Sequence, residues 1–167
     1  MTRDLETFLT NDEIAHGLRR YMAHHPRHFA VTGSIAREVH LGLLGVGPAE
    51  RTVGDVDLVV EGANSLPHSR ATGFLCPHVH PAAPAGGVLI QLVHLQDAVR
   101  FDAFKAADSA LARSSSIPFG AFSVPVLALE DLYAKAVVLL MKLGRGGTMP
   151  PNTQTTLTGC VVMRMRF

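Results

Sequence analysis

The sequence predicts one α+β (α/β) domain in which a mixed β-sheet of about four or five strands is flanked by helices. Apolar residues recur at helical spacing in three segments, and short β-branched or apolar runs lie between them. The chain has 167 residues, of which 47% are hydrophobic and 17% charged, so it can bury one core. We assign residues 1–143 to this domain. Residues 144–167 combine Gly and Pro pairs with a Thr-rich stretch and are expected to form an irregular C-terminal tail.

The first third of the chain predicts a helix, a strand and a second helix. Apolar residues at helical spacing over residues 11–24, with a polar pair at the start that can cap it, predict the first helix. Residues 29–32 form a short apolar run that predicts a buried strand. Gly33 is the turn after this strand. The second helix opens at Ser34 and ends before the Gly-Val-Gly-Pro breaker at 45–48.

The remainder of the domain predicts further strands and a final helix. The β-branched run at 55–61 predicts a strand, and residues 88–95 and 98–104 predict two more that are joined by a hairpin turn. The proline-rich residues 62–84 predict a loop, with brief sheet-edge pairing of 74–76 as an alternative. The last elements are a short helix at 106–113, an extended segment at 117–127 interrupted by two prolines, and a helix at 129–143.

Three aspartates carry the predicted chemistry. Asp55 and Asp57 are two residues apart on a strand, so both carboxylates point to the same face. Such a pair is costly unless a positive charge lies between the carboxylates, and Mg²⁺ prefers carboxylate oxygens. Asp102 lies among apolar residues on a later strand. If that strand pairs beside the first, three carboxylates meet and can hold two metal ions about 3.5–4 Å apart, as in-line nucleotidyl transfer requires.

Each aspartate also has a purely structural interpretation. Asp55 and Asp57 are then solvated loop residues, and Asp102 pairs with Arg100 on the same strand face. His78 and His80 are treated in the same way: a transition-metal role is the alternative to ordinary loop histidines, because no third ligand is near them in the sequence.

A turn that favours phosphate precedes these aspartates. Gly33 and Ser34 stand where a strand meets a helix N-terminus, and free backbone amides there attract anions. Glycine allows the backbone to come close to the ligand, and the Ser34 hydroxyl adds a donor. Arg37, one helical turn later, is placed to bind the same phosphate, with pairing to an acidic neighbour on the helix surface as the alternative.

Together, Gly33-Ser34, Asp55-x-Asp57 and the later Asp102 resemble the signature of the DNA-polymerase-β-type nucleotidyltransferase superfamily. Its small bacterial members include minimal nucleotidyltransferases and toxin–antitoxin-associated enzymes. The resemblance covers about residues 29–143 and extends to residues 126–135, which are similar to the helix that follows the core in these proteins. It therefore implies a nucleotidyltransferase-like fold.

The resemblance also implies roles for individual residues. Metal ligation by a two-ion Mg²⁺ site, with Mn²⁺ as the alternative ion, falls to Asp55, Asp57 and Asp102, and Asp102 is in addition a candidate base for the acceptor hydroxyl. Triphosphate binding falls to Gly33, Ser34, Arg37 and Lys135. Against these roles stands the interpretation that Lys135 only extends its amine to water from the flank of an apolar helix.

The expected activity is transfer of a nucleoside monophosphate from an NTP such as ATP to a hydroxyl-bearing acceptor, which is a tRNA, a protein or a small molecule. Two alternatives stay open. One is a catalytically silent nucleotide-binding module or toxin–antitoxin partner of the same fold. The other is a phosphohydrolase that uses the same metal ions.

Composition and motif searches exclude other classes. A net charge of +1 provides no general attraction to nucleic acid. The GxGxxG, GxxxxGK[ST] and GxSxG motifs are absent. The sequence has neither a signal-peptide pattern nor an apolar run that could span a membrane, and its two cysteines lie far apart. We therefore expect a cytoplasmic protein without a membrane partner.

Overall fold

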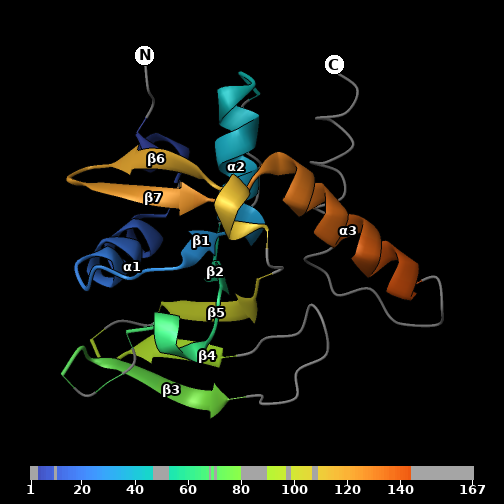
Figure 1. Ribbon diagram of the computed structural model, residues 1–167. Helices are drawn as coiled ribbons and strands as arrows, with labels where there is room; N and C mark the ends of the chain where they lie inside the picture. The colour runs from blue at the N-terminus through green and yellow to red at the C-terminus, as the bar shows by residue number, and fades with distance from the viewer. Residues whose placement is uncertain are drawn as a thin grey trace.

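The computed structural model describes residues 4–9, 11–46, 53–67, 69, 71–79, 90–96, 99–106 and 109–143. Within these ranges the chain forms one mixed sheet of seven strands in the order β3-β4-β5-β2-β1-β7-β6 (Figure 1). The strands are β1 (Phe29–Val31), β2 (Val56–Val60), β3 (Phe74–Val79), β4 (Ile90–His94), β5 (Arg100–Lys105), β6 (Ser115–Phe119) and β7 (Phe122–Val126). The helices are α1 (Asp12–Met22), α2 (Gly33–Leu43) and α3 (Leu129–Leu143), with short 3-10 turns η1 (Leu5–Phe8), η2 (Ala63–Ser65) and η3 (Leu111–Arg113).

The α+β class is confirmed, but the expected four or five strands were too few. The extended segment at 117–127 is a hairpin of β6 and β7 that turns at Gly120, which has a φ of +55°. β3 also occupies residues 74–79 of the loop expected at 62–84, so the alternative of sheet-edge pairing at 74–76 is confirmed and extended. Pro77 is tolerated there because β3 is an edge strand whose register shifts between Leu75 and His78. Pro125 is tolerated because β7 pairs with β1 only through Val126.

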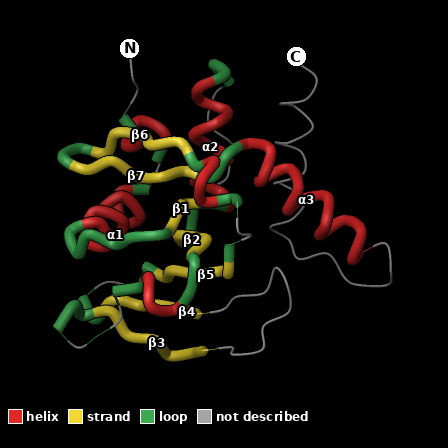
Figure 2. The backbone as a smooth tube through the Cα atoms, viewed as in Figure 1, coloured by secondary structure: helices red, strands yellow, loops and turns green. Residues whose placement is uncertain are grey.

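The helices agree with the sequence more closely than the strands do. All three long helices lie where they were expected, and α3 projects away from the sheet after β7 (Figure 2). The expected helix at 106–113 is corrected to the 3-10 turn η3 at its end, with residues 107 and 108 outside the described part. The tail at 144–167 lies entirely outside it. No helix within the described ranges has the length and apolar character needed to span a bilayer.

Helix α1 covers one face of the sheet through an aromatic cluster. The ring of Tyr21 stacks on Phe101 of β5 at 5.3 Å and meets Phe29 of β1 and Phe74 of β3 edge-on. Gly17 allows close approach, because a Cβ there would lie 2.9 Å from Val99. Neighbouring residues of a strand point to opposite faces, so Asp102 points away from Phe101 and from α1.

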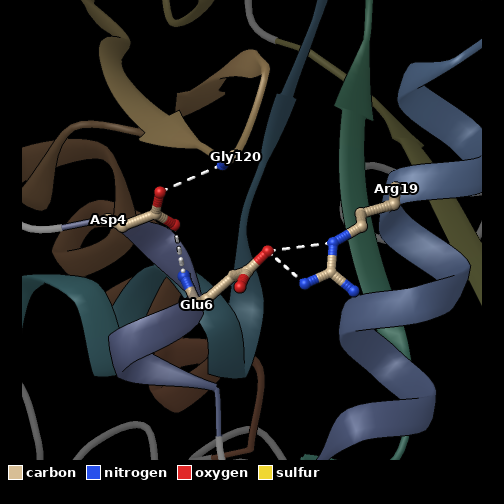
Figure 3. Close-up of polar contacts among 4 residues, drawn as sticks. All are labelled: Asp4, Glu6, Arg19 and Gly120. Carbon is tan, nitrogen blue, oxygen red and sulfur yellow. Dashed lines mark hydrogen bonds and ion pairs between the residues drawn. The ribbon is translucent and has the colours of Figure 1, made fainter.

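The N-terminal turn η1 ties three elements together (Figure 3). The Asp4 carboxylate accepts one hydrogen bond from the backbone N–H of Glu6 and another, of 3.0 Å, from the N–H of Gly120 in the β6–β7 turn. The Glu6 carboxylate pairs with Arg19 of α1. These contacts hold the β6–β7 hairpin and α1 against the start of the chain.

Candidate functional site

Asp57 and Asp102 lie side by side on the sheet face opposite α1. The strands β2 and β5 are parallel neighbours, and their register pairs Asp57 directly with Asp102. Register partners on adjacent strands present their side chains to the same face, with backbones about 4.8 Å apart. The pairing of the two aspartate-bearing strands, on which the predicted shared site depended, is therefore present.

Asp55 lies just before β2 and faces Arg100, which opens β5. One Arg100 terminal nitrogen lies 2.5 Å from the Asp55 Oδ2, and the Arg100 Nε lies 3.3 Å from the Asp102 Oδ2. Partial burial disfavours the charged guanidinium, but Asp102, Asp55 and Asp57 outweigh this effect and raise the pKa of Arg100 above its ordinary value. The pairing of Asp102 with Arg100 that we considered from the sequence is thus also present.

Gln91 is a member of this site that the sequence analysis missed. Its register partner on β5 is Asp102, and its side-chain amide donates a 3.0 Å hydrogen bond to the Asp102 Oδ1. With only 8% of its surface exposed, Asp102 depends on such partners for its orientation. The available signal was a single amide within an apolar strand, between Ile90 and Leu92.

The turn at Gly33 lies against the carboxylate of Asp57. Gly33 has a φ of +62°, and a Cβ built on it would lie 1.8 Å from the Asp57 Oδ2. The Thr32 N–H donates a 2.9 Å hydrogen bond to the Asp57 backbone oxygen. α2 begins at Gly33, so its free N-terminal amides start beside the two paired carboxylates. Ser34, the next residue, is half-buried.

Thr32 is a second residue of this turn that the sequence analysis did not select. It stands at the N-cap position of α2, yet its side chain makes no capping hydrogen bond. Its hydroxyl is fully buried and has no hydrogen-bond partner among the described residues. A buried hydroxyl without a partner costs desolvation energy, which a helix start with a side-chain cap avoids.

The two predicted basic residues have different positions. The guanidinium of Arg37 is buried and forms hydrogen bonds of 3.1 and 2.7 Å to Glu38. Pairing with an acidic neighbour is therefore present, but in the interior and not on the helix surface where we placed it. Lys135 falls in α3, and its side chain lies outside the described part. The same holds for the side chain of His78, and His80 itself lies outside the described ranges.

The side chains of this site suit a hard divalent cation, although the Arg100 guanidinium contacts two of their oxygens. The three aspartate side chains offer only carboxylate oxygens, which Mg²⁺ and Mn²⁺ prefer. As they stand, no three His, Cys, Asp or Glu side chains of the described residues gather closely enough to hold a metal ion. The oxygen donors fit a divalent ion in kind, and binding one requires the guanidinium to release Asp55 and Asp102 and the carboxylates to move closer together.

Comparison with known proteins gives a likeness in fold. No protein-family model matches the chain, and the search of curated proteins gave no match. Among solved structures, the chain is similar to the crystal structure of ANT(2")-Ia in complex with adenylyl-2"-tobramycin, with a TM-score of 0.52 and 12% sequence identity. The match covers 88% of this chain and 84% of that chain. At this identity the likeness shows a shared fold.

Proposed function

We propose that the chain is a nucleotidyltransferase that moves a nucleoside monophosphate from an NTP to a hydroxyl group, with Mg²⁺ held by Asp55, Asp57 and Asp102. The observation that carries this proposal is the register pairing of Asp57 with Asp102 directly beside the Gly33 turn. Carboxylates that hold a metal ion and amides that hold a phosphate then lie next to each other. The shared fold with ANT(2")-Ia supports the same class of reaction.

The proposed reaction is an in-line displacement at the α-phosphorus of the NTP. The acceptor oxygen forms a bond to that phosphorus, the bond to the pyrophosphate oxygen breaks, and pyrophosphate leaves. The hydroxyl proton passes to a base, for which Asp102 is the candidate. A bound divalent ion supplies charge stabilisation of the phosphate oxygens. The backbone at Gly33 and Ser34, with the side chain of Lys135 as a further candidate, holds the triphosphate.

Among tRNA, protein and small-molecule acceptors, we favour a small molecule with hydroxyl groups. The support is the ligand of the similar structure, adenylyl-2"-tobramycin, which is a nucleotidylated small molecule. The cytoplasmic location and a toxin–antitoxin partner stay predictions from the sequence.

The test is incubation of the protein with each of the four NTPs, labelled at the α-phosphate, with Mg²⁺ and one of three acceptors. The acceptors are tobramycin as an aminoglycoside, bulk tRNA and a protein mixture. We expect labelled product with at least one acceptor, and its loss in Asp57→Asn. Asp131→Asn is the matched control, because Asp131 is also an Arg-paired aspartate but belongs to α3. Absence of product with every acceptor, or product that persists in the Asp55→Ala/Asp57→Ala double variant, contradicts the proposal.

A catalytically silent nucleotide-binding module is the second candidate, and Arg100 is the observation that favours it. A guanidinium that neutralises Asp55 and Asp102 permanently would leave the face without room for a metal ion. This candidate predicts that calorimetry detects NTP binding that is independent of Mg²⁺, without product or pyrophosphate. The phosphohydrolase alternative instead predicts phosphate or pyrophosphate release without a labelled acceptor.

A further inference from the structure

Both carboxylate oxygens of Asp102 are engaged by protein side chains. Gln91 donates to the Oδ1, and Arg100 lies against the Oδ2 while it also binds Asp55. Gln91 is neutral and fixes the orientation of the carboxylate. Arg100 instead contributes a full positive charge at the edge shared by two of the three aspartates, which is where a divalent cation would also find its ligands.

Arg100 is much more exposed than Arg37, the arginine of the buried pair with Glu38 in α2. The side chain of Arg100 is 47% exposed, whereas that of Arg37, paired with Glu38, is only 4% exposed. Arg37 cannot leave its partner without separating two buried opposite charges. Arg100 can turn its guanidinium into water without burying its own charge, but the carboxylate side chains that it leaves, 20% and 11% exposed for Asp55 and Asp102, then need another cation. The geometry therefore makes Arg100 an exchangeable cation.

Charge balance gives this exchange a direction. Three carboxylates gathered around one point repel one another unless a cation lies among them, and Arg100 supplies that cation when no metal is bound. A divalent ion on the same oxygens carries twice the charge and repels the guanidinium at short distance. The two cations therefore exclude each other at Asp55 and Asp102.

We propose that Arg100 is a tethered counter-ion that competes with the divalent metal for Asp55 and Asp102 and turns away from both when the metal binds. The inference rests on the proposed function, because it assigns the metal to these carboxylates. In this role, Arg100 sets the affinity of the protein for the metal and offsets the mutual repulsion of the aspartates when no metal is bound. A lysine would replace it poorly, since one ammonium cannot reproduce the fork of contacts.

The first test measures Mn²⁺ binding by calorimetry and electron paramagnetic resonance, with no nucleotide present. We expect Arg100→Gln to bind Mn²⁺ roughly three- to ten-fold more tightly than the wild type, because the cation that competes for Asp55 and Asp102 is removed. Arg100→Lys should lie between the two and serves as the second variant if the glutamine variant does not fold. The matched control is Arg113→Gln, because the Arg113–Asp131 pair is similarly exposed, at 48% for Arg113, and includes none of the three aspartates.

The second test uses thermal unfolding with and without Mn²⁺. Without metal, Arg100→Gln should melt below the wild type, because its three carboxylates lack a cation. The same excess of Mn²⁺ should raise the Tm of Arg100→Gln more than that of the wild type, since stabilisation by a ligand grows with the logarithm of its concentration over its Kd. Arg113→Gln should gain the same rise as the wild type.

The outcomes separate the inference from the function on which it rests. Unchanged Mn²⁺ affinity in Arg100→Gln, with binding lost in Asp57→Asn, overturns the counter-ion role and leaves the proposed function intact. Absence of Mn²⁺ binding in the wild type and in every variant overturns both. Tighter binding in Arg100→Gln but not in Arg113→Gln supports the counter-ion role even if no acceptor has been identified.

Discussion

Asp57 and Asp102 are register partners on the parallel strands β2 and β5, and the backbone of Gly33 lies against the Asp57 carboxylate. Their spacing is fixed by hydrogen bonds of the sheet and does not depend on the path of a loop. Parallel pairing also brings together residues that lie far apart in the sequence, because β3 and β4 stand between β2 and β5 along the chain. The sheet thus sets the position of both carboxylates before any ligand is bound.

Substitution of Gly33 by alanine should damage this arrangement beyond ordinary strain. An added Cβ would collide with the Asp57 carboxylate, and the residue has a left-handed φ of +62°. We expect the free energy of unfolding in urea to fall by about 1–3 kcal/mol. Gly45→Ala is the control, because Gly45 has a φ of +74° and nothing within 4 Å of its added Cβ. Backbone strain alone should lower the stability of Gly45→Ala by roughly 1 kcal/mol. Equal losses in the two variants would show that contact with Asp57 is unimportant.

Gln91 should support the reaction through its hydrogen bond to Asp102. Removal of the amide in Gln91→Ala leaves the Asp102 Oδ1 without its donor. We expect the rate of product formation by Gln91→Ala to fall about ten-fold, as is typical of a residue that supports a metal ligand. The rate of Asp102→Asn, which changes the proposed ligand itself, should fall at least about 100-fold. Gln96→Ala, in the exposed turn after β4, should retain the wild-type rate. A Gln91→Ala rate that equals the control would restrict Gln91 to a structural role.

Asp55 and Asp57 were placed on one face from the sequence because both were expected on a strand. Asp55 instead lies at a bend just before β2, and Arg100 links its carboxylate to that of Asp102. The Gly33 turn was predicted locally, because Gly33 ends a short apolar run before a helical pattern. The pairing of β2 with β5 was only a condition, since register between distant strands is a tertiary property. Arg100 was considered as a partner of Asp102 because it lies on the same strand, whereas Gln91 was missed because it reaches Asp102 only through the antiparallel pairing of β4 with β5.

The strands that were missed contain prolines, which argue against sheet in a sequence. Pro77 lies at a register shift of an edge strand, and Pro125 lies on a strand that has few ladder contacts with β1. Edge position and irregular register are not visible before the sheet order is known. Arg37 shows the same limit for side chains: its helical position was predicted, but the packing that buries it with Glu38 is tertiary.

Removal of the Tyr21 hydroxyl should stabilise the protein. The hydroxyl is buried and has no hydrogen-bond partner among the described residues, and burial raises the pKa of Tyr21. Tyr21→Phe should raise the free energy of unfolding by up to about 1 kcal/mol, because the ring contacts are kept and an unsatisfied group is removed. Tyr21→Leu should instead lower it by roughly 2–4 kcal/mol through lost packing.

Alkaline pH should widen the difference between wild type and Tyr21→Phe. Below the pKa of tyrosine in the unfolded chain, the hydroxyl is protonated in both states, so its ionisation does not lower the free energy of unfolding. Above about pH 10 the unfolded chain loses this proton while the folded chain retains it, so the wild type becomes less stable. The phenylalanine variant lacks this term. Urea unfolding from pH 8 to pH 11 measures the difference, and a constant gap over that range would contradict the burial of the hydroxyl.

Variants of the buried pair of Arg37 and Glu38 should show whether Arg37 has a structural role or binds phosphate. Arg37→Ala removes the buried cation beside the Glu38 carboxylate, so we expect a loss of roughly 3–5 kcal/mol in the free energy of unfolding. The Arg37→Met/Glu38→Leu double variant removes both charges and should recover most of that loss. Its KM for the NTP decides the role. A KM equal to that of the wild type means that Arg37 acts only within the fold, whereas a KM raised about ten-fold in the stable double variant means that its guanidinium reaches the triphosphate.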